Sequence, residues 1–239
     1  WDSNVRLGKS DWMIIEGDEY QEKFLNFKPE YLLITNIDYD HPDTFPTKKS
    51  YREAFQKLTL QTSKKVFTSG KIESLNIEVF KPFYSNYLFG EHNKKNLNLV
   101  LALCRELGID ENKIKAGLSE FKGVRRRMDI YSQREHIIII DDYAHHPAEI
   151  FATLKAIKGQ WPERKIAAIF QPHTFSRTKA LLADFAQSFR DADEVYLAPT
   201  YSSARENPKD SQRIDEALYE NTRKFSQACF RGMPTEEKI

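Results

Sequence analysis

Four consecutive isoleucines occupy residues 137–140, and polar side chains follow them at once. Because alternation would be expected if one face of the strand met water, the run predicts a strand over residues 136–140 that is buried on both faces. Pro147 then precedes a helical pattern over residues 147–158, at a position where its missing N–H costs nothing. Five candidate side chains occupy the turn between them: Asp141, Asp142, Tyr143, His145 and His146.

Two interpretations of this turn are open. In open α/β sheets, ligands bind at the carboxyl ends of parallel strands, close to helix N-termini that favour anions. The same residues also fit a polar turn with a helix cap, in which acidic residues and histidine are ordinary. The adjacent carboxylates of Asp141 and Asp142 favour a site, because they repel each other unless a cation, a histidine or sugar hydroxyls use them.

The second half of the chain alternates strands and helices. Strands are predicted at 136–140, 165–170 and 194–199, with helices at 147–158 and 176–189 between them. This βαβαβ order is typical of a parallel sheet with right-handed crossovers, so we expect a doubly wound domain. The C-terminal residues show no last apolar strand. No GxGxxG sequence follows any strand, which disfavours a dinucleotide site of the usual kind.

The first half mixes short strands with longer helices. Strands are predicted at 12–15, 31–35, 66–68 and 75–80, and helices at 50–60, 90–108 and 110–121. In the helix at 90–108, the expected buried stripe is Leu97, Val100, Leu101 and Cys104. Gly123 and three arginines then interrupt the apolar periodicity. We therefore expect one domain over residues 1–122 and a second over residues 123–239.

Composition excludes several classes of protein. The 239 residues are 40% hydrophobic and 30% charged, and no apolar run approaches the roughly 18 residues that cross a membrane. A net charge of +1 gives no argument for binding nucleic acid or a membrane surface. Cys104 and Cys229 suggest neither a disulfide framework nor a metal-ligand spacing, so a reducing cytoplasm fits best. Because Trp1 is not an initiator and no leader pattern follows it, we expect the chain to begin inside a longer protein.

Candidate chemistry lies at the ends of the predicted strands. Glu16 and His41 each follow a strand and could hold Mg²⁺, although spacing alone favours two solvated loop residues. The arginines at 125–127 could stabilise a transferring phosphoryl group or form a solvated basic linker.

The stretch 171–179 has the same order of elements as the isoleucine strand and its turn. A predicted strand is followed by a turn that contains a proline and by His173. Ser176 is a possible N-cap, which would place Arg177 in the first helical turn. A cation there opposes the helix dipole, so replacing Arg177 should not lower stability. A bound anion would explain its presence.

Six motifs, in order, resemble those of the Mur ligases. They span about residues 16–205 and read EGDEY (16–20), TNIDYDHPD (35–43), GEHNKKN (90–96), FKGVRRRMD (121–129), DDYAHHPAE (141–149) and FQPHTFSRTK (170–179). The last two are most similar to the members that add L-alanine to UDP-N-acetylmuramate. The resemblance implies an α/β chain in which part of a central P-loop-type ATPase domain is followed by a Rossmann-like, amino-acid-binding domain with a parallel sheet.

The family reaction implies ATP and Mg²⁺ as cofactors, and UDP-N-acetylmuramate and L-alanine as substrates. ATP would phosphorylate the substrate carboxylate, and the amine of alanine would displace phosphate from the acyl phosphate. The resemblance makes Glu16 and His41 metal ligands and His92, Asn93 and Asn96 adenine-side contacts. It sets Asp142 at the ribose, and His145, Arg126 and Arg127 in catalytic positions. It sets Tyr143, His146, His173 and Arg177 around the alanine and the acyl phosphate.

The chain also departs from the family pattern. It contains no GxxxxGK[ST] loop to hold the ATP phosphates, and we expect the UDP-sugar domain to be absent, so the chain should be incomplete for catalysis. The alternatives are a related ligase that adds another amino acid or peptide, and a non-catalytic nucleotide-binding fragment. A further alternative is a metal-dependent phosphoesterase that uses Asp141, Asp142, His145 and His146.

Overall fold

The computed structural model describes residues 5, 7–69, 88–201, 211–226 and 228–232. We call residues 1–122 the first half and residues 123–239 the second half. The first half contains η1 (Tyr20–Asn26), β1 (Tyr31–Ile34), α1 (Lys48–Gln61), β2 (Lys65–Thr68), α3 (Glu91–Glu106) and α4 (Glu111–Glu120). The second half contains β3 (Asp129–Gln133), β4 (Ile138–Asp141), α5 (Pro147–Gln160), β5 (Ala167–Phe170), α6 (Phe175–Ala180), α7 (Leu182–Ser188), β6 (Glu194–Leu197), α8 (Ser211–Thr222) and β7 (Ala228–Arg231).

In the first half, β1 and β2 form a parallel pair that α1 connects. A reciprocal capping box between Thr47 and Ser50 starts α1, whose apolar face packs Tyr51 and Leu58 into a core with Phe24 and Phe45. The predicted strand at 12–15 is wrong: these residues form no strand, and Ile14 is 96% exposed. Within the described residues, β1 pairs with β2 and no strand partners this segment. The strand predicted at 75–80 lies outside the described residues.

The two helices that complete the first half begin and end close to where their sequence signals predict. Gly108 adopts φ +67 just after α3, and the Asp110 carboxylate accepts a hydrogen bond from the Asn112 amide at the start of α4. Leu97, Leu101 and Ile114 join the two helices in one small core. The predicted stripe on α3 is partly wrong, because Val100 is half-exposed and Leu99 is buried.

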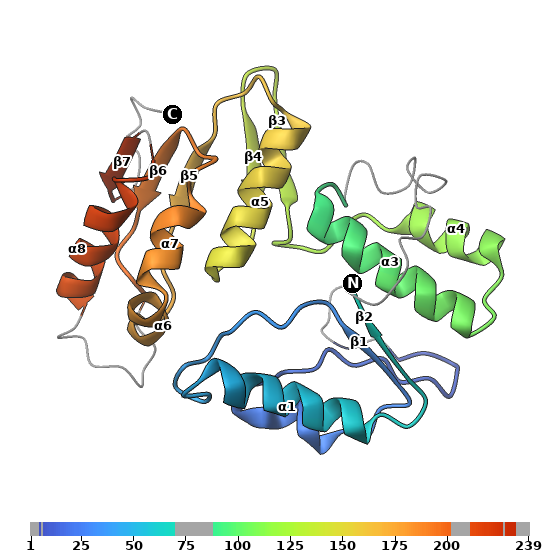
Figure 1. Cartoon of the computed structure of the whole chain (residues 1–239). Helices are drawn as coiled ribbons and strands as arrows, with labels where there is room; N and C mark the ends of the chain where they lie inside the picture. The colour runs from blue at the N-terminus through green and yellow to red at the C-terminus, as the bar shows by residue number, and fades with distance from the viewer. Residues whose placement is uncertain (1–4, 6, 70–87, 202–210, 227, 233–239) are drawn as a thin grey trace.

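The second half is built on a three-stranded parallel sheet in the order β5-β6-β7, which confirms the predicted α/β class with a parallel sheet. Helices α5, α7 and α8 lie next to one another along one side of the strands (Figure 1). Phe185, Phe189, Val195 and Leu218 are almost fully buried between the helices and the sheet. The chain does have a last strand, β7, which the sequence analysis missed.

The isoleucine strand differs most from its prediction. β4 pairs antiparallel with β3, and this hairpin is separate from the parallel ladder of β5, β6 and β7. Ile137 and Ile139 are 42% and 49% exposed, so the strand is not buried on both faces. Pairing with β3 points alternate side chains away from the core, and the register shifts around Tyr131 as in a β-bulge.

The single helix predicted at 176–189 is two short helices, α6 and α7, which meet at Leu181 (φ −113, ψ 23). Ser176 lies inside α6 and is not its N-cap. The helix begins at Phe175, after Thr174 in a left-handed conformation with φ +69. Arg177 is therefore placed by the α6 backbone with its side chain directed to the interior, where it is 6% exposed.

Among the described residues, packing contacts join the two halves around Tyr39 and around Gly90. Tyr39, from the loop after β1, packs against the hydrophobic cores of both halves. Gly90, at the start of α3, approaches Ala156 of α5 so closely that a Cβ at position 90 would lie 2.6 Å from the Ala156 Cβ. No helix among the described residues is long and apolar enough to cross a membrane.

Candidate active site at the junction of the two halves

The start of α5 is fixed by its own polar residues. Pro147 is the first helical residue, and His146 is the N-cap, with Nδ1 accepting a hydrogen bond from the Ala148 amide at 3.2 Å. Glu149 accepts hydrogen bonds from the amides of His145 and His146. Because Nδ1 of His146 accepts, Nε2 carries the hydrogen and donates to the Tyr39 carbonyl oxygen at 3.0 Å. The cap of α5 therefore also binds the first half.

The carboxylate of Asp142 organises the turn before that cap. It accepts hydrogen bonds from the amide of Met128 at 2.7 Å and from the amide of Ala144 at 2.8 Å. The amide of Tyr143 donates to the Arg126 carbonyl oxygen at 2.7 Å. These bonds hold a tight bend at residues 124–127 against the turn, with Arg126 and Met128 in left-handed conformations. Asp142 thus has a structural role here, and its predicted contact with ribose stays a prediction.

Two arginines gather at the face of Tyr143. The guanidinium carbon of Arg126 lies 4.5 Å from the ring centroid, and that of Arg127 lies 5.7 Å from it. Arg127 Nη1 is 3.7 Å from Glu149 Oε1, and Arg126 Nε is 3.9 Å from Asp141 Oδ2. Both side chains are about half-exposed, so these ion pairs are weak and the guanidinium groups are accessible to an anionic ligand.

His145 sits beside them with one ring nitrogen engaged. Its Nδ1 is 2.9 Å from the Tyr143 carbonyl oxygen, which can only accept, so Nδ1 carries the hydrogen of a neutral ring. Nε2 then holds the lone pair. Glu149 Oε2 lies 3.6 Å from Nδ1. Such an imidazole can accept a proton from a bound group.

Of the three predicted adenine-side residues at the start of α3, only some lie near the turn before α5. Burial lowers the pKa of His92, although the charges of Asp142 and Glu149 in the second half act to raise it. Asn93 donates to the Phe89 carbonyl oxygen at 3.0 Å and contacts the Met128 sulfur at 3.7 Å. Asn96 lies one turn further along α3 and is exposed.

His41 pairs with a carboxylate that the sequence analysis missed. Its Nε2 lies 3.5 Å from Glu19 Oε1, whereas the predicted partner, Glu16, is exposed in an extended segment. The hydrogen bond with His41 lowers the pKa of Glu19. Burial would lower the pKa of His41, but Glu19 and Asp40 outweigh burial and raise it. The signal was present, because Glu19 belongs to the same EGDEY motif as Glu16.

Oxygen and imidazole donors at this spacing fit Mg²⁺, which takes one or two carboxylates and completes its shell with water and phosphate oxygens. The described residues contain no group of three or more His, Cys, Asp or Glu side chains able to hold a metal ion. Any metal bound here would therefore need ligands from water or a substrate. The side chains of His41 and Glu19 are 21% and 27% exposed, so they remain accessible to such ligands.

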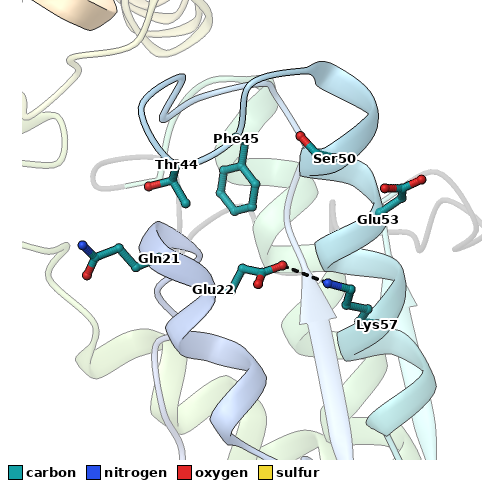
Figure 2. A pocket seen from close by; sticks show the side chains of 7 residues that line it. All are labelled: Gln21, Glu22, Thr44, Phe45, Ser50, Glu53 and Lys57. Carbon is teal, nitrogen blue, oxygen red and sulfur yellow. Dashed lines mark hydrogen bonds and ion pairs between the residues drawn. The ribbon is translucent and has the colours of Figure 1, made fainter.

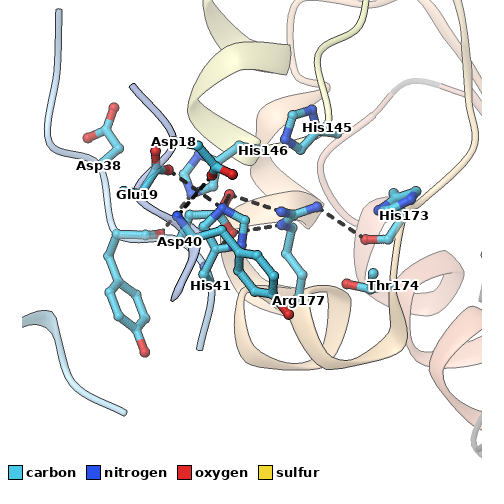
Figure 3. A network of polar contacts seen from close by, with 12 residues as sticks. Asp18, Glu19, Asp38, Asp40, His41, His145, His146, His173, Thr174 and Arg177 are labelled. Carbon is cyan, nitrogen blue, oxygen red and sulfur yellow. Dashed lines mark hydrogen bonds and ion pairs between the residues drawn. The ribbon is translucent and has the colours of Figure 1, made fainter. Parts of the chain in front are cut away.

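Arg177 makes the strongest polar contact of the junction. Its Nε donates to Asp40 Oδ1 at 2.7 Å and its Nη2 to Asp40 Oδ2 at 3.0 Å, as Figure 3 shows. Burial would raise the pKa of Asp40, but the hydrogen bonds and charge of Arg177 lower it. The sequence analysis expected that replacing Arg177 would not lower stability. With this buried pair we expect a loss, since removing one partner leaves a buried charge. Asp40 lies 137 residues away in sequence, so the pattern around Arg177 could not reveal it.

His173 lies on the other side of Arg177 from Asp40 (Figure 3). Its ring stacks on Tyr201 with centroids 5.4 Å apart and planes inclined by 15°. Thr174 and Tyr201 are joined by a backbone hydrogen bond between the carboxyl ends of β5 and β6. Tyr201, which is 58% exposed, is a second side chain of this region that the sequence analysis did not identify.

Two hollows of similar size occur among the described residues, and one of them borders the site. One, of about 310 Å³, lies between η1 and α1 around the ion pair of Glu22 with Lys57, away from the histidines (Figure 2). The other, of about 330 Å³, opens between the loop at Tyr39 and helices α5 and α7, beside His146. We place the candidate site at the junction because the polar side chains converge there, and the second hollow borders it.

Comparisons with known proteins identify relatives of this chain. Residues 126–231 match the family model described as Mur ligase, glutamate ligase domain. The UDP-N-acetylmuramate–L-alanine ligase of Ligilactobacillus salivarius is 40% identical over 82% of this chain and 52% of the relative. The enzyme of the same name from Desulfitobacterium hafniense is 36% identical over 85% of this chain and 54% of its own length. The chain thus spans about half the length of these curated relatives.

Solved structures show the same likeness. The crystal structure of a UDP-N-acetylmuramate–alanine ligase from Thermotoga maritima aligns with a TM-score of 0.62 and 28% identity, over 91% of this chain and 55% of that one. A murein peptide ligase from Psychrobacter arcticus aligns with a TM-score of 0.56 at 17% identity, over 88% of this chain and 51% of that one, which shows a shared fold.

Proposed function

The chain belongs to the Mur ligase family, and we propose that it acts in an ATP-dependent ligase that joins L-alanine to UDP-N-acetylmuramate. The observation that carries the proposal is the convergence of side chains from four of the six motifs. Tyr39 and Asp40 from the first half bind His146 and Arg177 of the second half, and the charge of Asp142 acts on His92. The relatives named for L-alanine support the choice of amino acid over other acceptors.

In the proposed reaction, a carboxylate oxygen of UDP-N-acetylmuramate attacks the γ-phosphorus of ATP, and ADP leaves. The amine of L-alanine then attacks the acyl carbon, an amide bond forms, and phosphate leaves with the bonding electrons of the acyl C–O bond. Mg²⁺ would supply charge neutralisation for the phosphoryl oxygens. Arg126 and Arg127 would bind those oxygens, because their guanidinium groups are accessible beside Tyr143. His145 would accept the amine proton at Nε2, the ring nitrogen that holds the lone pair.

We propose that the metal is held by His41 with Glu19, in place of the predicted pair of His41 with Glu16. The support is the 3.5 Å separation and the partial exposure of both side chains. Residues 1–122 would form the ATP-binding domain, with His92, Asn93, Asn96 and Asp142 on the nucleotide side. Residues 123–239 would form the amino-acid-binding domain, with Tyr143, His146 and His173 near the alanine. Both cysteines are free, which fits a reaction in the cytoplasm.

A chimera tests the proposal. The part of the Ligilactobacillus salivarius enzyme that this chain does not match is joined ahead of it, and phosphate release is measured with ATP, Mg²⁺, UDP-N-acetylmuramate and each amino acid in turn. We expect release that depends on both substrates and is fastest with L-alanine. His145→Asn in the chimera should remove most of this rate, and the parent relative serves as the positive control.

Three results would contradict the proposal in different ways. A folded chimera without phosphate release, beside an active parent, would remove the ligase assignment. Faster release with another amino acid or a peptide would change the acceptor. Hydrolysis of a phosphate ester without ATP or alanine would favour the phosphoesterase alternative.

A further inference from the structure

Asp40 has no role in the proposed reaction, yet its surroundings are unusual. Among the residues that the structure describes, Asp40 and Arg177 are the two charged side chains that are buried, at 8% and 6% exposure. They come from opposite halves and form a two-point contact at 2.7 and 3.0 Å. The carboxylate of Asp40 therefore contributes to the contact between the halves, in a place that water barely reaches.

Asp40 also fixes the backbone of its neighbour. Its Oδ1 accepts a hydrogen bond from the His41 amide at 2.7 Å. His41 has φ +54, a left-handed conformation that a non-glycine residue keeps only where surrounding contacts hold it. The His41 carbonyl oxygen accepts from the amides of Thr44 and Phe45, which holds the other side of the same bend. The orientation of the His41 ring thus depends on Asp40.

The residue before Asp40 makes a second contact with the other half. The Tyr39 carbonyl oxygen accepts from His146 Nε2 at 3.0 Å, and the Tyr39 hydroxyl donates to the Phe45 carbonyl oxygen at 2.6 Å. Three consecutive residues therefore make three different contacts. Tyr39 contacts α5, Asp40 contacts α6, and His41 faces Glu19, as Figure 3 shows for the labelled side chains.

We propose that Asp40 is a positioning residue for the reaction, an inference that rests on the proposed function. Through Arg177 it seats the loop of residues 38–41 against α6, so that His41 and Glu19 face the second half. Arg177 accordingly acts on the reaction through Asp40. The guanidinium nitrogens that would bind a substrate carboxylate two-fold already bind Asp40, and the third, Nη1, points to the His173 carbonyl oxygen at 3.5 Å.

The first test uses the 239-residue chain without ligands. Asp40→Asn, Arg177→Gln, the double variant and the control Asp38→Asn are compared by small-angle X-ray scattering and thermal melting. Asp38 is a matched control, because it is an exposed carboxylate on the same loop. Each single variant leaves one buried charge unpaired, so we expect a larger radius of gyration and a melting temperature lower by roughly 6–20 °C. The control should match the wild type.

The double variant, Asp40→Asn with Arg177→Gln, can still test the proposal if a single variant fails to fold. With both charges removed, no buried charge is left uncompensated, so it should melt above the worse single variant while remaining more open than the wild type. If Asp40→Asn, or the double variant where that single variant does not fold, has the wild-type radius and melting temperature, the pair does not hold the halves together. That result would overturn the proposal without touching the ligase assignment.

The second test separates positioning from substrate contact in the active chimera. If Arg177 acts through Asp40, then Asp40→Asn and Arg177→Gln should both lower kcat and raise the Mg²⁺ concentration needed for the half-maximal rate. Their effects should not add in the double variant. If instead Arg177→Gln raises the KM for a substrate roughly 10-fold or more and Asp40→Asn does not, Arg177 contacts that substrate and the proposal is wrong. An inactive chimera would count against the proposed function, and the scattering test would still decide the role of Asp40.

Discussion

Asp141 and Asp142 are adjacent in sequence but have different surroundings. The Asp141 side chain is 53% exposed and lies 3.9 Å from Arg126. The Asp142 side chain accepts two backbone hydrogen bonds that tie residue 128 to the turn before α5. The sequence analysis treated them as one acidic pair, because nothing in the local pattern shows which carboxylate faces the backbone amides.

Replacing Asp142 should therefore destabilise the fold much more than replacing its neighbour. Asp142→Ala leaves the amides of Met128 and Ala144 without their acceptor, and we expect a loss of about 2–4 kcal/mol in the free energy of unfolding. Asp141→Ala, the control, should change it by less than about 0.5 kcal/mol. Urea unfolding followed by circular dichroism gives both values. Equal effects of the two substitutions would contradict the structural role of Asp142.

Arg177 shows the same limit for a single residue. Its position near a helix start suggested an unfavourable cation awaiting an anionic ligand, and the structure supplies the anion from Asp40. The sequence analysis expected a bound anion at the guanidinium, whereas the structure shows the carboxylate of Asp40 there. Partners that are distant in sequence decide this kind of assignment, and a single sequence does not pair them.

At the scale of elements, the helices of this chain were predicted better than its strands. Helices α3, α4 and α5 carry their start and stop signals within their own segments, through Gly90, Asp110, Pro147 and the apolar periodicity. A strand depends on a partner elsewhere in the chain. The residues at 12–15 are apolar but have no partner strand among the described residues. β4 pairs antiparallel with β3, whose sequence mixes polar and apolar residues.

The two faces of β4 should respond differently to a polar substitution. Ile139 is 49% exposed, so Ile139→Thr keeps a β-branched side chain at an exposed position and should change the free energy of unfolding by less than about 0.5 kcal/mol. Ile140 faces inward beside Ile130, and Ile140→Thr should cost about 1–2 kcal/mol. Denaturant unfolding measures both variants. Equal, large losses would restore the interpretation of a strand buried on both faces.

At the scale of the whole molecule, Gly90 sets how closely the halves approach. Its φ of +93 disfavours any side chain, and a Cβ there would overlap Ala156 of α5. Sequence analysis placed Gly90 at a helix start but could not show that a helix of the other half lies against it.

Gly90→Ala should destabilise the protein by about 2–5 kcal/mol, because backbone strain adds to overlap in a packed contact. Gly108→Ala is the matched control: φ is +67 but nothing lies within 4 Å, so only strain of about 1–2 kcal/mol is expected. Adding Ala156→Gly to Gly90→Ala should recover part of the loss by removing the overlapping methyl group. Urea unfolding of the four proteins tests this, and a Gly90→Ala variant no worse than Gly108→Ala would show that the helices do not meet there.

Tyr39 gives the molecule a property that neither half has alone. Its ring packs against the core that holds Phe45 and Tyr51 and also against the core built on β5 and β6. One side chain therefore contributes buried area to two hydrophobic cores, and melting of either core removes packing from the other. Unfolding free energy is shared across the junction in this way, so we expect local opening of one half to loosen the other.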